Sequence, residues 1–250
     1  MPEVNAAMTR LVVAHAAVVA VPVLAVFLVL GLWLLALPVA LVVAVGVTVW
    51  RTRGIDARVA RTIDARPVDD DEAPRLAALA ETMAMAVGVP VPRLWLIESE
   101  SGNAVSWGVS NGPSNLAVTT GLLETTDLIG LEAVVGHQLS VVHGRAVEVV
   151  TLAAALFGPF ARGPLAPVVA SLVGADVQQQ VERADIAGAR TTRYPPAMVG
   201  VLDALRSAPT RLEAIPPALT GLCFAAPHHH EGPFSVHPPL DDRIDLLREI

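Results

Sequence analysis

The amino-acid sequence predicts a mainly helical α+β domain with a small β-sheet, preceded by two transmembrane helices. Three observations predict this fold class. Residues 11–50 are almost continuously apolar, with His15 as the only ionisable residue, and at 1.5 Å per residue they extend to roughly twice the thickness of a bilayer core. Beyond residue 50, apolar residues recur at helical spacing in several segments. Three short runs between these segments have the composition of β-strands.

The composition favours a membrane protein. The chain has 250 residues, of which 53% are hydrophobic and 16% are charged, an apolar excess over soluble domains. The net charge of -7 gives no indication of a nucleic-acid partner. The single cysteine, Cys223, excludes an internal disulfide and is expected to be a small buried apolar residue. All 17 basic residues are arginine, which is associated with GC-rich bacterial genomes.

We expect residues 1–53 to form a hairpin of two spanning helices that turns near Gly31. Arg10 precedes the first helix, and Arg51 and Arg53 follow the second. The positive-inside rule therefore places both ends of the hairpin in the cytoplasm. The chain is then a multi-pass protein of the cell membrane whose soluble domain faces the cytoplasm. The alternative is a helical hairpin buried in a soluble core, which the length of the apolar stretch disfavours.

Residues 54–72 are predicted to be a polar linker, and residues 73–250 the folded domain. The acidic run 69–72 is typical of a helix start, and Gly88 is typical of the end of that helix. Strands are expected at residues 93–98, 103–110 and 115–119, and a short helix at residues 122–125. An Asn-Gly-Pro-Ser turn separates the second strand from the third.

A long central helix is predicted from residue 131 through 150 and onward to Phe157. Residues 147–173 are predicted to be a hydrophobic helix pair that prolines interrupt. This pair either lies against or dips into the membrane, or packs on the first two helices. Further helices are expected at residues 175–190, 195–207 and 239–250. For the adjacent residues His228 to His230, a solvated loop is favoured over a specific metal site.

The central helix has the shape of a zinc-protease helix but lacks most of its zinc chemistry. Such a helix carries His-Glu-x-x-His, which puts two imidazoles on one face and a general base beside the first. Here the first and last positions of the motif are His137 and Val141, and the base position is Gln138. An amide cannot accept a proton near neutral pH. By itself, a lone histidine on an apolar helix is more often a buried structural residue than a ligand.

The order of these segments resembles the HtpX-type membrane zinc metallopeptidases, the family that includes the CaaX prenyl-protein endopeptidases. The resemblance implies a zincin-like metallopeptidase domain and covers most of the chain. It rests on the segments NAVSWGV (103–109), LAVTTGLLE (116–124), LEAVVGHQLSVVHGR (131–145), RADIAGA (183–189) and FSVHPPLDDRI (234–244).

The resemblance implies that the zinc site has been lost. The first histidine ligand of the family matches His137, and its second matches Val141. Its third ligand, a glutamate, matches Val181, and its catalytic glutamate matches Gln138. Two of three ligands and the base are therefore absent, and a degenerate, inactive member is expected. His143 does not replace the second ligand, because it lies about 240° around the helix from His137.

Other polar positions of the family pattern are retained. Asp185 matches an aspartate that supports the ligands, and we expect it to hydrogen-bond His137. His237 and Arg243 match a histidine and an arginine that lie near the reacting carbonyl in family members. Glu182 is rotated about 100° from the third ligand position. A one-residue shift of the match would restore a glutamate ligand, but the match at Ala184 and Asp185 argues against that shift. Two valines in place of ligands predict a dry apolar pocket that is stable without a cofactor.

The expected function is therefore that of a membrane-anchored, catalytically inactive metallopeptidase homologue. It would act as a binding, scaffold or regulatory subunit for a membrane protein or a peptide. The family holds peptides as an added strand beside a sheet edge, which here matches Asn103, Ala104 and Val105. Two alternatives remain open. One is an HtpX-type zinc metalloendopeptidase with an altered or partner-completed site, and the other is a structural membrane subunit without peptide binding.

Overall fold

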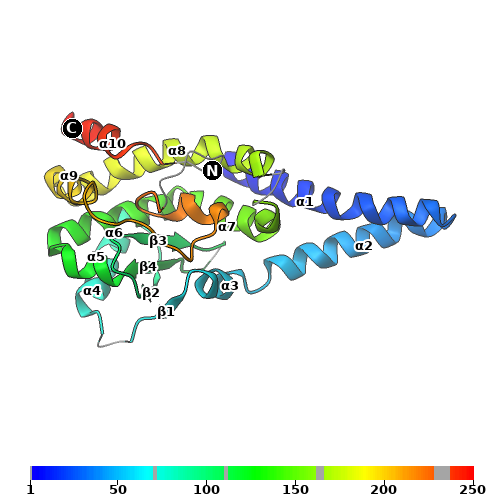
Figure 1. The fold of residues 1–250 in the computed structure, drawn as a ribbon, viewed down its shortest axis with the longest axis horizontal. Helices are drawn as coiled ribbons and strands as arrows, with labels where there is room; N and C mark the ends of the chain where they lie inside the picture. The colour runs from blue at the N-terminus through cyan, green and yellow to red at the C-terminus, as the bar shows by residue number, and fades with distance from the viewer. Residues whose placement is uncertain (1, 70–71, 110–111, 162–165, 228–236) are drawn as a thin grey trace.

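The computed structural model contains a long helical hairpin that projects from a helical domain around one small sheet (Figure 1). It describes residues 2–69, 72–109, 112–161, 166–227 and 237–250, without the side chains of residues 2, 3 and 172–179. The predicted histidine loop at His228 to His230, and parts of the 111–114 turn and the 234–244 segment, lie outside these residues.

The described chain is mostly helical, with four strands in one sheet, which confirms the predicted fold class. The helices are α1 Pro2–Val29, α2 Trp33–Thr52, α3 Ile55–Thr62, α4 Pro74–Val87, α5 Thr120–Thr125, α6 Leu128–His143, α7 Ala146–Phe157, α8 Ala166–Thr191, α9 Pro195–Ala204 and α10 Leu240–Arg248. Two short 3-10 helices are η1 Gly158–Phe160 and η2 Pro217–Leu222. The strands are β1 Ala65–Pro67, β2 Arg93–Ile97, β3 Ala104–Trp107 and β4 Asn115–Thr119.

The first two helices form the apolar hairpin that the sequence predicts. Each is long and apolar enough to cross a membrane. The chain turns at Gly31, whose φ of 71° is a conformation that glycine adopts without a Cβ clash. Small side chains of α2 face α1 and allow the two backbones to approach. These buried residues are Ala36, Ala40, Ala44 and Thr48. Thr48 Oγ1 lies 2.9 Å from His15 Nδ1, which ties the two helices together.

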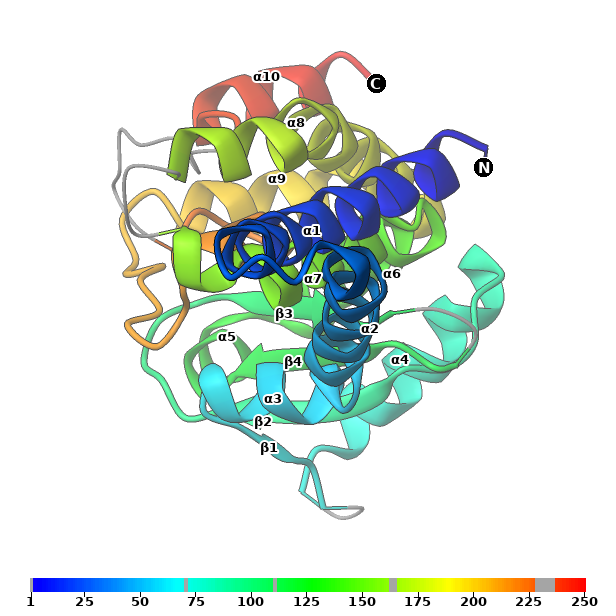
Figure 2. The same cartoon turned by 90° about the vertical axis from the view of Figure 1, so that its right-hand side faces the viewer.

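The first half of α1 packs on the domain and does not project from it. Leu11 is buried in an apolar cluster with Leu156 and Phe157 of α7 and Val169 of α8. The His15 ring contacts Phe157 edge-on, with ring centroids 5.7 Å apart. Helix α7 of the predicted hydrophobic pair therefore packs on the first helix of the hairpin, and contact of the pair with the membrane stays a prediction. Figure 2, viewed along the hairpin, shows α1 lying across α7.

The stretch predicted as a linker belongs to the folded domain. Within residues 54–72, helix α3 buries Ile55, Val59 and Ala60. Strand β1 then pairs antiparallel with β2, with Ala65 opposite Ile97. The apolar residues of α3 recur at helical spacing. The many charged residues of this stretch make its overall composition resemble that of a linker, so the sequence does not predict the helix.

The sheet has the strand order β1-β2-β4-β3. Strands β2 and β4 are parallel neighbours, and β3 runs antiparallel to β4 at the sheet edge, with Ala104 opposite Val118. These three strands lie within the predicted ranges. All five residues of β4 are buried, because α6 and α7 pack on opposite sides of this part of the sheet.

The sequence predicts one continuous central helix. In the structure this helix is broken after His143. Helices α6 and α7 meet at an angle of 73°. At the break, Arg145 adopts a left-handed conformation with φ 61°, which costs about 1 kcal/mol for a non-glycine residue. Its side chain donates two hydrogen bonds, of 2.9 and 2.7 Å, to the carboxylate of Glu148 and so stabilises the bend.

The other helices differ from their predicted bounds at their starts. Helix α4 begins at Pro74, after the acidic run, because proline fits the first helical turn. It ends as predicted at Gly88, which has φ 78°. Helix α8 begins at Ala166, nine residues before the predicted start. Helices α9 and α10 lie within the predicted ranges.

Helices α6 and α8 cross at glycines. A Cβ on Gly188 would lie 2.8 Å from the backbone nitrogen of His137 and 3.1 Å from the Cε of Met198. On the α6 side, a Cβ on Gly136 would lie 3.6 Å from the Cα of Gly188. This close approach holds the backbone of His137 directly against α8, so the glycine positions the candidate site.

Gly188→Ala is therefore expected to destabilise the protein by about 1–3 kcal/mol, since overpacking separates α6 from α8. Gly200→Ala is the matched control, because its Cβ would have nothing within 4 Å on helix α9. The control is expected to gain up to about 1 kcal/mol from helix propensity. Thermal unfolding of both variants in mild detergent measures the difference. Equal melting temperatures would contradict the close approach.

Candidate functional site

The candidate site is a buried polar cluster contributed by three helices. His137 comes from α6, Asp185 from α8 and Arg243 from α10, and each is at most 1% exposed. The Nδ1 atom of His137 lies 2.8 Å from Oδ1 of Asp185. The sequence-based expectation of this contact rested on the resemblance, and the structure places the two side chains at hydrogen-bonding distance.

Arg243 neutralises Asp185 by a two-pronged ion pair. Its Nε and Nη2 donate to Oδ2 and Oδ1 of the carboxylate, both at 2.7 Å. Its Nη1 donates to the carbonyl oxygen of Phe224 at 2.8 Å. Paired hydrogen bonds of this kind are the strong ones in proteins. The Phe224 ring fills the space between, 5.0 Å from the His137 ring and 5.1 Å from the Arg243 guanidinium carbon.

The ionisation of the cluster follows from these contacts. Burial alone would raise the pKa of Asp185, but the charge and hydrogen bonds of Arg243 hold that pKa below its ordinary value. Burial lowers the pKa of His137, and the charge of Arg243 adds to the effect against the opposing influence of Asp185. At neutral pH the cluster is therefore a charged Asp185–Arg243 pair beside a neutral imidazole.

The residues at the family's other ligand positions do not fit a metal. Val141 and Val181 are buried and offer only alkyl groups. Val141 packs in an apolar cluster with Val105 and Ala184. In the part of the chain that the structure describes, no three His, Cys, Asp or Glu side chains are placed to hold a metal ion. A catalytic zinc needs three protein ligands, so this arrangement does not match a zinc site.

Gln138, at the general-base position, is engaged in a structural hydrogen bond. Its Nε2 donates to the carbonyl oxygen of Ala104 at 3.1 Å, so the side chain ties α6 to strand β3. A glutamate carboxylate could not make this bond, because an ionised carboxylate only accepts hydrogen bonds. The Oε1 of Gln138 is buried, and no described residue donates to it.

The sheet edge expected to receive a peptide is already covered by the chain itself. Val105 pairs antiparallel with Cys223, and Phe224 N donates to the Ala104 carbonyl oxygen at 2.8 Å. We call residues 222–225 the edge segment. Asn103, Ala104 and Val105 are fully buried beneath it. The predicted addition of a peptide beside these three residues stays a prediction, and it would require these bonds to be replaced.

The side chain of Asn103 fastens the edge segment. Its Nδ2 donates to the carbonyl oxygens of Thr210 and Ala225, each at 3.0 Å. Its Oδ1 accepts from the backbone nitrogens of Ala104 at 2.9 Å and Ala225 at 3.2 Å. Asn103 thus acts as a clamp between strand β3 and a segment over a hundred residues away. The sequence offers no local pattern that predicts this pairing.

His237 lies at the margin of the same cluster. Its Nε2 is 2.9 Å from the carbonyl oxygen of Thr220. Burial lowers its pKa to about 4, and the charge of Arg243 contributes in the same direction. The charge of Arg243 therefore acts on His237, which is neutral at physiological pH.

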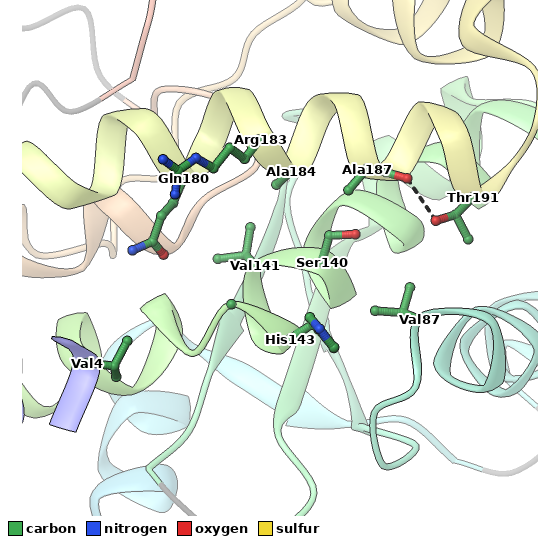
Figure 3. A pocket seen from close by; sticks show the side chains of 11 residues that line it. Val4, Val87, Ser140, Val141, His143, Gln180, Arg183, Ala184, Ala187 and Thr191 are labelled. Atoms are coloured by element: carbon green, nitrogen blue, oxygen red, sulfur yellow. Dashed lines mark hydrogen bonds between the residues drawn. The ribbon is translucent and has the colours of Figure 1, made fainter. Parts of the chain in front are cut away.

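A separate cavity of about 500 Å³ lies beside the ends of α6 and α8 (Figure 3). Val141 and His143 line it from α6, and Gln180 lines it from α8. Val4 of α1 and Val87 of α4 complete its walls. His143 thus lines a cavity next to Val141, whereas His137 is buried in the polar cluster. No pattern in the sequence predicts that these residues lie together.

Comparison with known proteins gives a consistent result. No protein-family model matches the chain. It is 29% identical over 264 aligned residues to "Protease HtpX homolog" of Streptococcus agalactiae serotype III, which covers 90% of this chain and 89% of that protein. It is also 29% identical over 229 residues to "Protease HtpX homolog" of Streptococcus pyogenes serotype M28, covering 75% and 77% of the two chains.

Arg243→Met is expected to destabilise the protein by about 3–5 kcal/mol, because it leaves the Asp185 carboxylate buried without its partner. Arg248→Met on the same helix is the control, since Arg248 is exposed and its pair with Asp245 contributes little. Denaturant unfolding in detergent measures both. Adding Asp185→Asn to Arg243→Met should recover part of the loss, and a loss that matches the control would contradict the role of the ion pair.

Stability is also expected to fall in mild acid. Folded His237 has a pKa of about 4, below the value of about 6.5 for an unfolded imidazole, so between these values the unfolded state binds more protons. Its contribution is therefore complete above about pH 6.5, and about 3 kcal/mol of it is lost by the time the pH has fallen to 4. His237→Gln should flatten this slope in denaturant unfolding between pH 4.5 and 7. If the pH dependence of stability is the same in His237→Gln as in the wild type, His237 is not its source.

Proposed function

We propose that the chain, which is similar over most of its length to proteins named "Protease HtpX homolog", is a membrane-anchored metallopeptidase homologue of the HtpX type that does not hydrolyse peptides. The observation that carries the proposal is the hydrogen bond from Gln138 Nε2 to the Ala104 carbonyl oxygen. The residue at the general-base position is committed to holding the sheet edge. Loss of a general base alone typically costs about 10² to 10⁴ in rate.

The ligand positions support the same conclusion. A histidine at 141 or a glutamate at 181 without a metal would be a buried polar group without a partner, at a cost of about 1–3 kcal/mol. Valine at both positions removes that cost. The changes at Gln138, Val141 and Val181 therefore agree with one another, which supports a site adapted to remain without zinc.

The retained polar residues have a structural role in this proposal. The pair of Asp185 with Arg243 satisfies the buried carboxylate without a metal, and it holds the imidazole of His137 in place. A side chain that would support a metal ligand then serves as a link between α8 and α10. This accounts for the retention of Asp185 and Arg243 in a chain that lacks the ligands.

A chain of this kind is left with a binding role, as a scaffold or regulatory subunit for a membrane protein or a peptide. An extended peptide can add to β3 only by displacing the edge segment, together with its bonds to Asn103 and Ala104. A peptide partner at this edge is therefore expected to bind weakly, because it has to replace existing bonds. A partner that contacts the outer surface avoids that cost.

The proposal includes two membrane spans with the domain in the cytoplasm. Trp33 and Trp50, at opposite ends of α2, are 68% and 65% exposed. They are about 25 Å apart along the helix, which suits aromatic anchors at both interfaces of a bilayer. Arg10, Arg51 and Arg53 at the open end of the hairpin support the cytoplasmic side.

The decisive test is the zinc content of the purified full-length protein after dialysis against slight excess zinc. The wild type is expected to hold less than about a tenth of an equivalent, because it supplies only one of three ligands. The variant Gln138→Glu/Val141→His/Val181→Glu, which restores the family pattern, should hold more zinc if it folds. Casein cleavage is expected to be absent in the wild type.

Near-stoichiometric zinc in the wild type that is lost in His137→Ala would overturn the proposal, whatever the restored variant does. Such a result would favour an active enzyme whose missing ligands come from elsewhere. The circular dichroism spectrum of each variant separates loss of zinc from loss of fold.

A further inference from the structure

A second cavity lies where the hairpin joins the domain. It has a volume of about 600 Å³, and we call it the foot cavity. Trp50 and Arg51 line it from the end of α2, and Arg58 lines it from α3. The end of α7 and the segment leading into η2 form the remaining walls. Figure 2, viewed along the hairpin, shows α2, α3 and α7 grouped on the face from which the hairpin projects.

We propose that the foot cavity holds the headgroup of an anionic phospholipid from the surrounding bilayer. Its walls are mostly apolar, with Ile55, Val59 and Leu219 among them. Arg51 and Arg58 are the charged side chains among the described lining residues, and no aspartate or glutamate is among these residues. A hollow with apolar walls and two guanidinium groups suits a phosphate that is attached to hydrocarbon.

Arg58 is already fixed for this role. Its Nη1 donates to the carbonyl oxygen of Trp50 at 3.3 Å, and its Nη2 donates to the carbonyl oxygen of Arg51. These bonds cap the end of α2 and hold the guanidinium at the cavity wall. A fixed guanidinium loses less side-chain entropy when it binds a phosphate than a mobile one does.

The foot of the hairpin, residues 51–62, carries four arginines and a single carboxylate, Asp56. Arg51, Arg53, Arg58 and Arg61 follow one another over the end of α2 and through α3. In the described parts of the chain, none of the four forms an ion pair with a carboxylate. An anion from outside the chain is therefore the group that matches this surface.

The position of the foot cavity selects a lipid over a free anion. Arg51 ends a helix that is apolar enough to cross a membrane, and exposed Trp50 is typical of the headgroup level. Exposed Val45 and Val49 on the preceding turns offer apolar surface to an acyl chain. The cavity thus lies at the depth of lipid phosphates. This inference does not depend on whether the chain hydrolyses peptides.

The test measures lipid retained by the purified full-length protein. The protein in mild detergent is incubated with phosphatidylglycerol or phosphatidylcholine, and bound lipid is counted by native mass spectrometry. Retention of phosphatidylglycerol is expected to exceed that of phosphatidylcholine, and Arg51→Gln should lower it about fivefold. Arg53→Gln is the matched control. Arg53 lies two residues after Arg51 and carries the same charge, but its side chain is exposed and lies outside the foot cavity.

A second variant guards against a change in fold. Ala155→Leu fills part of the foot cavity and keeps every charge, so it should also reduce phosphatidylglycerol retention. Equal retention in Arg51→Gln and Arg53→Gln would overturn the proposal, as would equal binding of phosphatidylcholine. Displacement of the lipid by soluble glycerol phosphate at millimolar concentration would also overturn it, because the site would then recognise an anion and not a lipid.

Discussion

The ion pair between Asp185 and Arg243 is the interaction on which the domain depends. Both side chains are fully buried, and burying two charges is unfavourable unless their hydrogen bonds are satisfied. Arg243 meets this condition with bonds to both carboxylate oxygens and to the Phe224 carbonyl. Because α8 supplies the acid and α10 the base, the pair fixes two helices that are distant in sequence. His137 of α6 contacts the same carboxylate, so a third helix joins them.

The same ion pair explains why the sheet edge is closed. Phe224 is held from two sides, since its carbonyl accepts from Arg243 and its N–H donates to Ala104 of β3. The segment that covers the edge is thus anchored to the buried charge of the cluster. Opening the edge would require loss of bonds to β3 and a change around Arg243. These backbone groups of β3 are thus paired within the chain.

The sequence predicted those parts of the fold that rest on local patterns. The apolar hairpin and the strands β2 and β4 follow from composition and spacing, and the resemblance indicated the neighbours of His137. Three features escaped prediction. The helical spacing of apolar residues in α3 is obscured by the charged residues between them. The bend before α7 depends on the left-handed backbone conformation of Arg145. The closure of β3 by the edge segment pairs residues over a hundred positions apart, which leaves no local trace.

The membrane anchor and the site domain form one packed unit and are not two modules joined by a linker. Leu11 and His15 of α1 contact α7, which begins directly after the helix that carries His137 and Gln138. Helix α7 also lines the foot cavity through Ala155. The hairpin therefore positions α7, and through the fixed bend at Arg145 it also positions α6. On the proposed placement of the hairpin in a bilayer, the site is held at one height relative to the membrane, which suits the proposed membrane-bound partners.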